Sequence, residues 1–184
     1  MALTTYQRLK SLLAIKPDDT NHDAVMAEII ERVSAEIVGR CRRTFEFASG
    51  ITEYFDGDGV SSVVVLSRSP NVAVTSLYDD TNRTYASSSL IQPADYVVDG
   101  NTGVITLNGF FFARSLQNIK VIYDGGYKTI PQDLERAALI YAASDFLDHQ
   151  GELRVSLDVE VINKIDRQRK EAGVTIDRYV RFIL

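Results

Sequence analysis

The chain has 184 residues and a mass of 20.5 kDa, which is enough for one large domain or two small ones. Hydrophobic residues make up 45% of it, so it can bury a core and is not wholly disordered. Its formal net charge of −5 argues against a general nucleic-acid binder, because such proteins are usually basic. No apolar run approaches the ~18 residues that a membrane helix needs, so we expect no membrane partner.

The N-terminus and the cysteine content suggest a compartment. The first residues lack the long apolar region and the small-residue cleavage site of a signal peptide. Cys41 is the only cysteine, so no internal disulfide can form. Both features favour a reducing cytoplasm.

The charge is unevenly distributed along the chain. Between Lys164 and Leu184 there are six basic and three acidic residues, a net charge of +3, which leaves −8 for the remainder. This asymmetry indicates either that the C-terminal segment meets an acidic partner or that it is a solvated helix face.

Two helices are predicted in the N-terminal part. Residues 4–13 fit a short helix, and residues 25–41 repeat apolar side chains at helical spacing. Thr20 and Asp23 resemble a capping box ahead of the second helix. Basic side chains at the end of a helix offset its negative dipole, and three cluster at this one: Arg40, Arg42 and Arg43.

From about residue 51 the pattern changes to short alternating segments. Turn-forming residues separate them at 56–59, 79–82 and 99–103. Short strands at this spacing predict an antiparallel sheet or a small sandwich. The apolar run of Phe110, Phe111 and Phe112 either packs in its core, which we favour, or protrudes from a loop. The predicted strands are 51–55, 63–66, 72–78, 96–98, 104–107 and 118–123.

The segment 118–138 combines a strand, a turn and a helix start. Gly125 and Gly126 can adopt positive φ, which permits a sharp turn after the strand. Pro131 suits the first helical position, and Asp133 and Glu135 suit the positive end of the helix. The segment has well-specified geometry and no reactive group, which indicates a structural part and not an enzyme.

Helices return in the C-terminal part. One is predicted from Pro131 to about residue 150, ended by Gly151, with small residues along one face. Another is predicted over 159–171, stopping at Ala172 and Gly173, and residues 174–184 fit a strand or a helix equally.

This order of elements predicts an α+β fold. The β segment lies between helical parts, so helices from both ends should pack as one small bundle that carries an inserted antiparallel sheet or sandwich. The expected parts are N-terminal helices (1–48), a β insertion (49–127), and C-terminal helices with a tail (128–184).

Residues with metal-binding chemistry are sparse. Asp145 and His149 are spaced i, i+4 and could bind a metal in principle, but no further ligand is near in sequence, so an exposed helical pair is favoured. Asp56 and Asp58 suggest a calcium loop, which fails because serines stand where the EF-hand needs glycine and glutamate. A tight hairpin turn is the favoured interpretation there.

Signatures of nucleotide binding and of nucleophilic catalysis are also missing. Gly57 and Gly59 lack the third glycine of a dinucleotide fingerprint, and a strand follows them. There is no Walker loop and no serine elbow. Cys41 lies on the apolar stripe of a helix, where a small buried residue is expected. We therefore predict no catalytic residue, no metal and no cofactor.

Several of these segments resemble phage head–tail connector (adaptor) proteins. Residues 121–127 (VIYDGGY) and 130–137 (IPQDLERA) are similar to the signature of that family. Residues 74–79 (VTSLYD), 96–99 (YVVD) and 103–105 (GVI) resemble the β portion of its longer members, and the early helix with its arginine-rich end fits as well. The resemblance covers roughly residues 4–150.

The resemblance implies a structural part of a phage or prophage particle. Such adaptors form a ring, commonly of twelve subunits, beneath the portal, and they offer a platform for a stopper or tail-completion protein. The ring extends the DNA channel, through which DNA would pass without specific binding. The expected location is the virion neck, after assembly in the host cytoplasm.

In this family the C-terminal segment engages the portal, which here corresponds to residues 159–184. The apolar end of the chain would be hard for a lone subunit to cover, and we expect it to order on the portal. The expected portal-binding residues are Arg178, Tyr179, Arg181, Phe182, Ile183 and Leu184.

Two other classes remain open from the sequence. The β insertion could be a ligand-binding module for a glycan or peptide, with Phe110, Phe111 and Phe112 as its support. A small hydrolase is opposed by the presence of only two histidines and by the missing nucleophile motif.

Overall fold

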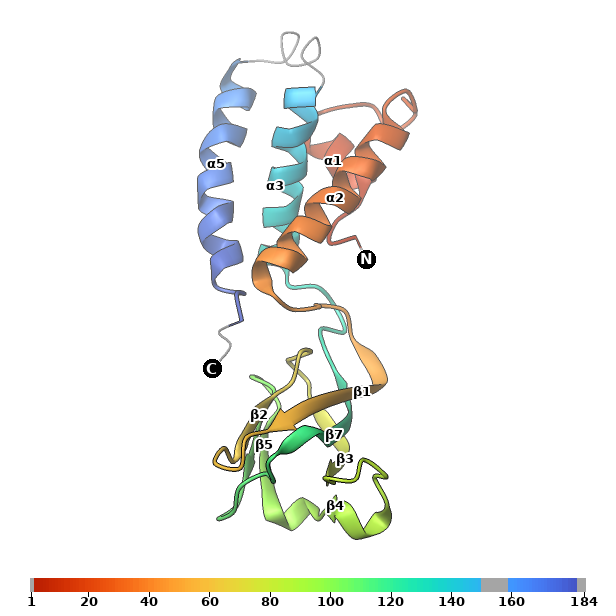
Figure 1. Ribbon diagram of the computed structural model, residues 1–184. Helices are drawn as coiled ribbons and strands as arrows, with labels where there is room; N and C mark the ends of the chain where they lie inside the picture. Colours follow the sequence, from red (N-terminus) through yellow and green to blue (C-terminus); the bar gives the residue numbers. More distant parts are fainter. Residues whose placement is uncertain (1, 150–158, 182–184) are drawn as a thin grey trace. The chain divides into compact units, whose positions relative to one another are not determined.

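The computed structural model describes residues 2–149 and 159–181. The chain forms two compact units, a helical unit built from residues up to Arg43 and from Ile130 onward, and a β unit from Thr44 to Thr129. Figure 1 shows that helices from before and after the β unit pack together in the helical unit. The predicted α+β class, with helices from both ends of the chain and an inserted antiparallel β part, is confirmed.

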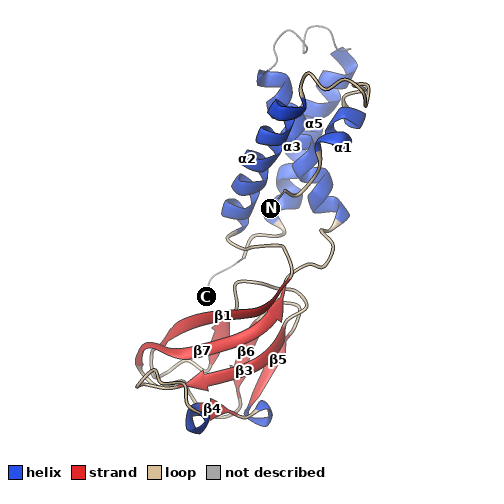
Figure 2. Ribbon diagram, turned by 90° about the vertical axis from the view of Figure 1, so that its right-hand side faces the viewer, coloured by secondary structure: helices blue, strands red, loops and turns tan. Residues whose placement is uncertain are grey.

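Helix α3 is the centre of the helical unit. It contacts each of the other three helices of the described chain (Figures 1 and 2). Alanines at four of its buried positions let those helices approach closely: Ala137, Ala138, Ala142 and Ala143. The helices are α1 (Tyr6–Leu12), α2 (Asp23–Cys41), α3 (Gln132–His149) and α5 (Val159–Asp177).

Helix α2 buries the apolar stripe that its sequence predicts, from Met26 to Cys41. The predicted capping box is wrong, because the N-cap residue is His22 and it makes no side-chain cap bond. The Asp23 carboxylate instead lies 2.5 Å from the ammonium of Lys10, whose side chain is only 4% exposed. A buried lysine needs such a partner, because an unpaired charge in the interior is costly.

The boundaries of α3 and α5 differ from those predicted. Pro131 immediately precedes α3 and accepts the Glu135 N–H at 2.9 Å, so it lies one residue before the predicted position. Helix α5 does not stop at Gly173 but continues to Asp177. Its next turn buries Ile176 completely, and that burial outweighs the ~1 kcal/mol that a glycine costs inside a helix. Gly151, the predicted end of α3, lies outside the described residues.

The β unit is a sandwich of two antiparallel sheets (Figure 2). A shared core of apolar side chains from both sheets lies between them and includes Leu77, Ile105, Val121 and Tyr123. One sheet has the order β1 (Ala48–Gly57), β7 (Ser115–Gly125), β3 (Ala73–Asp79) and β4 (Leu90–Ile91). The other has the order β2 (Val63–Val65), β6 (Val104–Leu107) and β5 (Tyr96–Asp99).

The predicted hairpin at residues 56–59 is wrong. β1 pairs with β7 and β2 pairs with β6, so the segment between β1 and β2 carries the chain from one sheet to the other. Asp58 shapes this link, because its carboxylate accepts the backbone N–H groups of Val60 and Ser61 at 2.9 and 2.6 Å. These bonds favour the ionised carboxylate and lower the pKa of Asp58.

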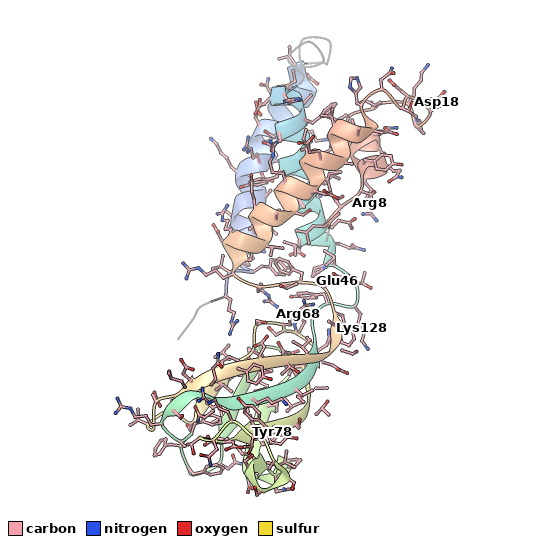
Figure 3. The ribbon with its side chains drawn as sticks, turned by 45° about the vertical axis from the view of Figure 1, so that its right-hand side comes forward. Arg8, Asp18, Glu46, Arg68, Tyr78 and Lys128 are labelled. Carbon is pink, nitrogen blue, oxygen red and sulfur yellow. The ribbon has the colours of Figure 1, made fainter. Side chains whose placement is uncertain are left out.

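The two glycines at the end of β7 serve different purposes. Gly126 has a φ of 113°, as predicted, whereas Gly125 does not adopt a positive φ. A Cβ atom on Gly125 would lie 2.6 Å from the Arg68 carbonyl oxygen, so close packing requires the glycine there. The Arg68 guanidinium in turn donates to the Glu46 carbonyl oxygen at 2.9 Å, and both residues are labelled in Figure 3.

Candidate assembly surfaces

The end of α5 carries the described members of the predicted portal-binding set. Arg178 is exposed and follows the last helical residue. The Tyr179 hydroxyl donates to the Asp133 carboxylate of α3 at 2.7 Å, and the Arg181 N–H donates to the Cys41 carbonyl oxygen at 3.0 Å. The segment after α5 is therefore attached to both α3 and the C-terminal end of α2. Phe182, Ile183 and Leu184 lie outside the described residues.

A polar contact joins the ends of the same helices. The Arg40 guanidinium lies 2.6 Å from the Asp177 carboxylate and 3.5 Å from the Tyr141 hydroxyl. About half of each charged side chain is exposed, 44% for Arg40 and 56% for Asp177. Such exposed pairs contribute at most about 1 kcal/mol, so this one orients the helix ends more than it stabilises them.

A groove of about 270 Å³ lies between α3 and α5. Ala137, Ile140 and Ala172 give it an apolar floor, and Asp133 and Glu171 are among the charged residues of its wall. Its lining contains no cysteine, histidine or serine.

The candidate metal and nucleophile residues are not assembled into a site. Asp145 pairs with Arg32 at 2.9 Å, while His149 is exposed at the end of α3. Among the described residues, no group of three or more histidine, cysteine or acidic side chains could hold a metal ion. Cys41 is fully buried, as predicted, and burial raises the pKa of its thiol, which disfavours the reactive thiolate.

No helix in the described part of the chain is both long enough and apolar enough to cross a bilayer.

The aromatic run of the β unit is divided between core and surface. Phe112 is 1% exposed and belongs to the core, as predicted, but Phe110 and Phe111 are 39% and 62% exposed. The Phe112 N–H donates to the Ser61 carbonyl oxygen at 3.0 Å, which brings this run beside the link that contains the exposed Val60. Periodicity in the sequence does not show that Val60 and the pair Phe110 and Phe111 lie close together, because each belongs to an irregular loop.

Neither a protein-family model nor a curated protein matches the sequence. Solved structures do match it in fold. A chain described as the neck of a native GTA particle, computed with C12 symmetry, is 16% identical with a TM-score of 0.55, and the match covers 88% of this chain and 85% of that one.

Two further structures give the same result. A chain from the neck of an empty GTA particle, computed with C6 symmetry, is 18% identical with a TM-score of 0.56. A chain from the virion of a native gene transfer agent (GTA) particle is 15% identical with a TM-score of 0.60. Both matches cover 96% of this chain and 89% of the other. The protein thus has the fold of chains from gene transfer agent necks and virions, which is consistent with the resemblance of its sequence to head–tail connector proteins.

Proposed function

We propose that the chain is a head–tail connector subunit, which forms a ring between the portal and the tail or stopper of a phage-like particle. The observation that carries the proposal is the fold shared with neck chains over 88–96% of this chain. The C12 and C6 symmetries of those necks support a closed ring, and we propose twelve subunits. The ring would extend the DNA channel at the virion neck after assembly in the host cytoplasm.

The end of the chain supplies the proposed portal contact. Tyr179 and Arg181 attach the segment after α5 to the helical unit. Phe182, Ile183 and Leu184 would then dock on the portal, with Arg178 beside them. The subunit would act by offering surfaces to its neighbours, without catalysis.

Electron microscopy of the purified protein mixed with its cognate portal tests the proposal. We expect an added ring at the narrow end of the portal. A variant that lacks residues 182–184 should lose portal binding and keep its fold, whereas the Phe111→Ser variant, altered at an exposed position of the β unit, should bind normally. Portal binding by the shortened chain at wild-type affinity would rule out the terminal contact.

The alternative of a ligand-binding module has one supporting observation, the 62% exposure of Phe111 beside the exposed Val60. A screen of glycans and peptides against the free subunit tests it. Specific, saturable binding that the Phe111→Ser variant loses would favour the ligand-binding module.

A further inference from the structure

Helix α5 has an exposed row of residues with two cations at its centre. Residues three or four positions apart lie on the same side of a helix. The row takes steps of four, three and four residues within α5: Asn163, Arg167, Lys170 and Val174. All four are exposed, Val174 to 60%. Within residues 2–149 and 159–181, neither Arg167 nor Lys170 forms an ion pair. We call these four residues the basic row.

Helix α2 has a row with the same steps and the opposite charge. Its members lie within α2 and are all exposed: Ala24, Glu28, Glu31 and Ala35. In the described part of the chain neither glutamate forms an ion pair. The two alanines let a neighbouring helix approach closely, because the distance between packed helices depends on the side chains at the contact. We call these four residues the acidic row.

Both rows face away from the core of the helical unit. Buried residues occupy the opposite side of each helix, among them Ile30 and Ile37 on α2 and Ile165 and Ile176 on α5. Because the rows are exposed, they do not meet within one subunit. Figure 1 shows that α2 and α5 run in the same direction, with α3 packed against both. Two rows with equal steps on helices of the same direction can be aligned residue by residue.

We propose that the basic row of one subunit packs against the acidic row of the next copy in the ring, with both helices along the ring axis. Alternating steps of four and three residues are those by which two parallel helices pack in a coiled coil. The pairs are Asn163 with Ala24, Arg167 with Glu28, Lys170 with Glu31, and Val174 with Ala35. The inference rests on the proposed ring and names the surfaces that join its subunits.

A second copy of this chain fits the rows better than another partner does, because one chain carries both halves of the contact. A head-to-tail contact that closes into a ring needs two different patches on each subunit. A row of one charge repels its own copy, so the charges disfavour a two-fold dimer through either row. Exposed ion pairs add little affinity each, but they select the partner and its orientation. The rows share no residue with the proposed portal contact, which begins at Arg178.

Charge reversal of the basic row tests the contact. The R167E/K170E variant, mixed with the portal and imaged by electron microscopy, should bind as separate subunits. Closed rings should be at least about tenfold fewer than for the wild type, because like charges would face each other. The matched control is K16E/R83E, which has the same change in charge at an exposed lysine and an exposed arginine outside both rows. This control should form the wild-type ring.

Reversal of both rows in one chain makes the test specific. The E28K/E31K variant should also lose closed rings, because its acidic row becomes basic. The combined variant E28K/E31K/R167E/K170E has the net charge of the wild type and again pairs opposite charges at every contact. It should form closed rings, a rescue that damage to the fold of either helix would not produce.

Cross-linking tests the predicted alignment without a change in charge. A chain with Ala35→Cys and Val174→Cys carries one cysteine at the same end of each row. Mild oxidation of its rings on the portal should give a ladder of linked subunits on a non-reducing gel. The single variants Ala35→Cys and Val174→Cys are the controls and should give no ladder, since the native Cys41 is buried.

The outcomes separate this contact from the proposed function. If the wild-type chain forms no ring on the portal, the proposed function fails and the contact fails with it. If the wild type forms rings, equally complete rings of R167E/K170E overturn only the contact, as does the lack of a ladder from the double-cysteine chain. Loss of portal binding that the combined variant does not restore would assign the basic row to the portal and would also overturn the contact.

Discussion

At the scale of single residues, Asp80 shows how one carboxylate organises a loop. Its oxygens accept the Asn82 N–H at 2.9 Å, the Thr84 N–H at 3.0 Å, the Thr84 hydroxyl at 2.7 Å and the Tyr85 N–H at 2.7 Å. Because these donors favour the ionised form, they lower the pKa of Asp80 to about 2, and the Thr84 hydroxyl contributes most. The loop that follows β3 is therefore held by a negative charge.

The pH dependence of this contribution has a definite sign. A pKa that is lower in the folded chain stabilises the fold above the ordinary value of 3.8, and the stabilisation disappears as the pH falls through about 2. Asp80→Asn should destabilise the protein at neutral pH, and the difference from wild type should shrink between pH 4 and 2. Urea unfolding at several pH values measures it, with the exposed Asp18→Asn as the control. A difference that stays constant over this range would contradict the assignment.

Gly126 adopts the positive φ that the sequence predicts for the turn after β7. Its φ is 113°, and a Cβ atom there would lie 2.4 Å from the Glu46 carbonyl oxygen. Gly126→Ala should therefore destabilise the protein by more than about 1 kcal/mol. The control is Gly39→Ala in α2, where a Cβ atom meets nothing within 4 Å. That change should stabilise by about 0.5–1 kcal/mol.

Chemical denaturation of both variants measures these free energies of unfolding. Opposite signs at the two glycines are the expected result. Equal effects would mean that the turn after β7 tolerates a side chain.

At the scale of elements, the last turns of α5 belong to the helical unit and not to a separate tail. Ile176 is fully buried, its carbonyl oxygen accepts the Cys41 thiol at 3.6 Å, and Asp177 pairs with Arg40. A deletion that begins at Val174 would therefore remove part of the core. Residues 174–181 are therefore part of the helical unit.

Two truncations test which C-terminal residues belong to the helical unit. Removal of residues 174–184 should lower the free energy of unfolding by at least about 2 kcal/mol, because it empties the site of a buried isoleucine. Removal of residues 182–184 should leave it unchanged, since it keeps the buried Ile176 and the contacts of Asp177, Tyr179 and Arg181. Thermal unfolding followed by circular dichroism compares the two. Equal loss in both would show that the terminal residues stabilise the helical unit.

The predicted elements were correct where a periodic pattern was long enough to identify them. Alternation identified β7, and helical spacing identified α2. β4 has only two residues, too few to show any period. The link between β1 and β2 was mistaken for a hairpin because its turn residues suit both, and only the pairing of β1 with the distant β7 distinguishes them.

At the scale of the whole molecule, the β unit has its own core and closely spaced ends. The Tyr127 N–H donates to the Phe45 carbonyl oxygen at 2.7 Å, and the Phe47 N–H donates to the Tyr127 carbonyl oxygen at 3.1 Å. These bonds hold together the two segments by which the chain enters and leaves the unit, one before β1 and one after β7. An inserted unit with such ends should fold without the rest of the chain.

We therefore predict that the fragment 44–129 folds on its own. Its amide NMR spectrum should be dispersed, and its thermal unfolding should be cooperative. The same fragment with Val121→Asp, which places a charge in the core, should be unfolded and serves as the control. A wild-type fragment without a folded spectrum would show that the β unit depends on the helices.

The sequence by itself determined the class of each long element, the turn at Gly126 and the insertion of strands between helices. These features follow from side-chain periodicity and backbone sterics, which act between residues a few positions apart. Only the tertiary structure decided that α5 passes through Gly173, that β1 joins the sheet of β7, and that Val97 and Val174 stay exposed. Burial and strand pairing depend on residues far apart in the chain, such as Cys41 and Ile176, and no local pattern contains that information.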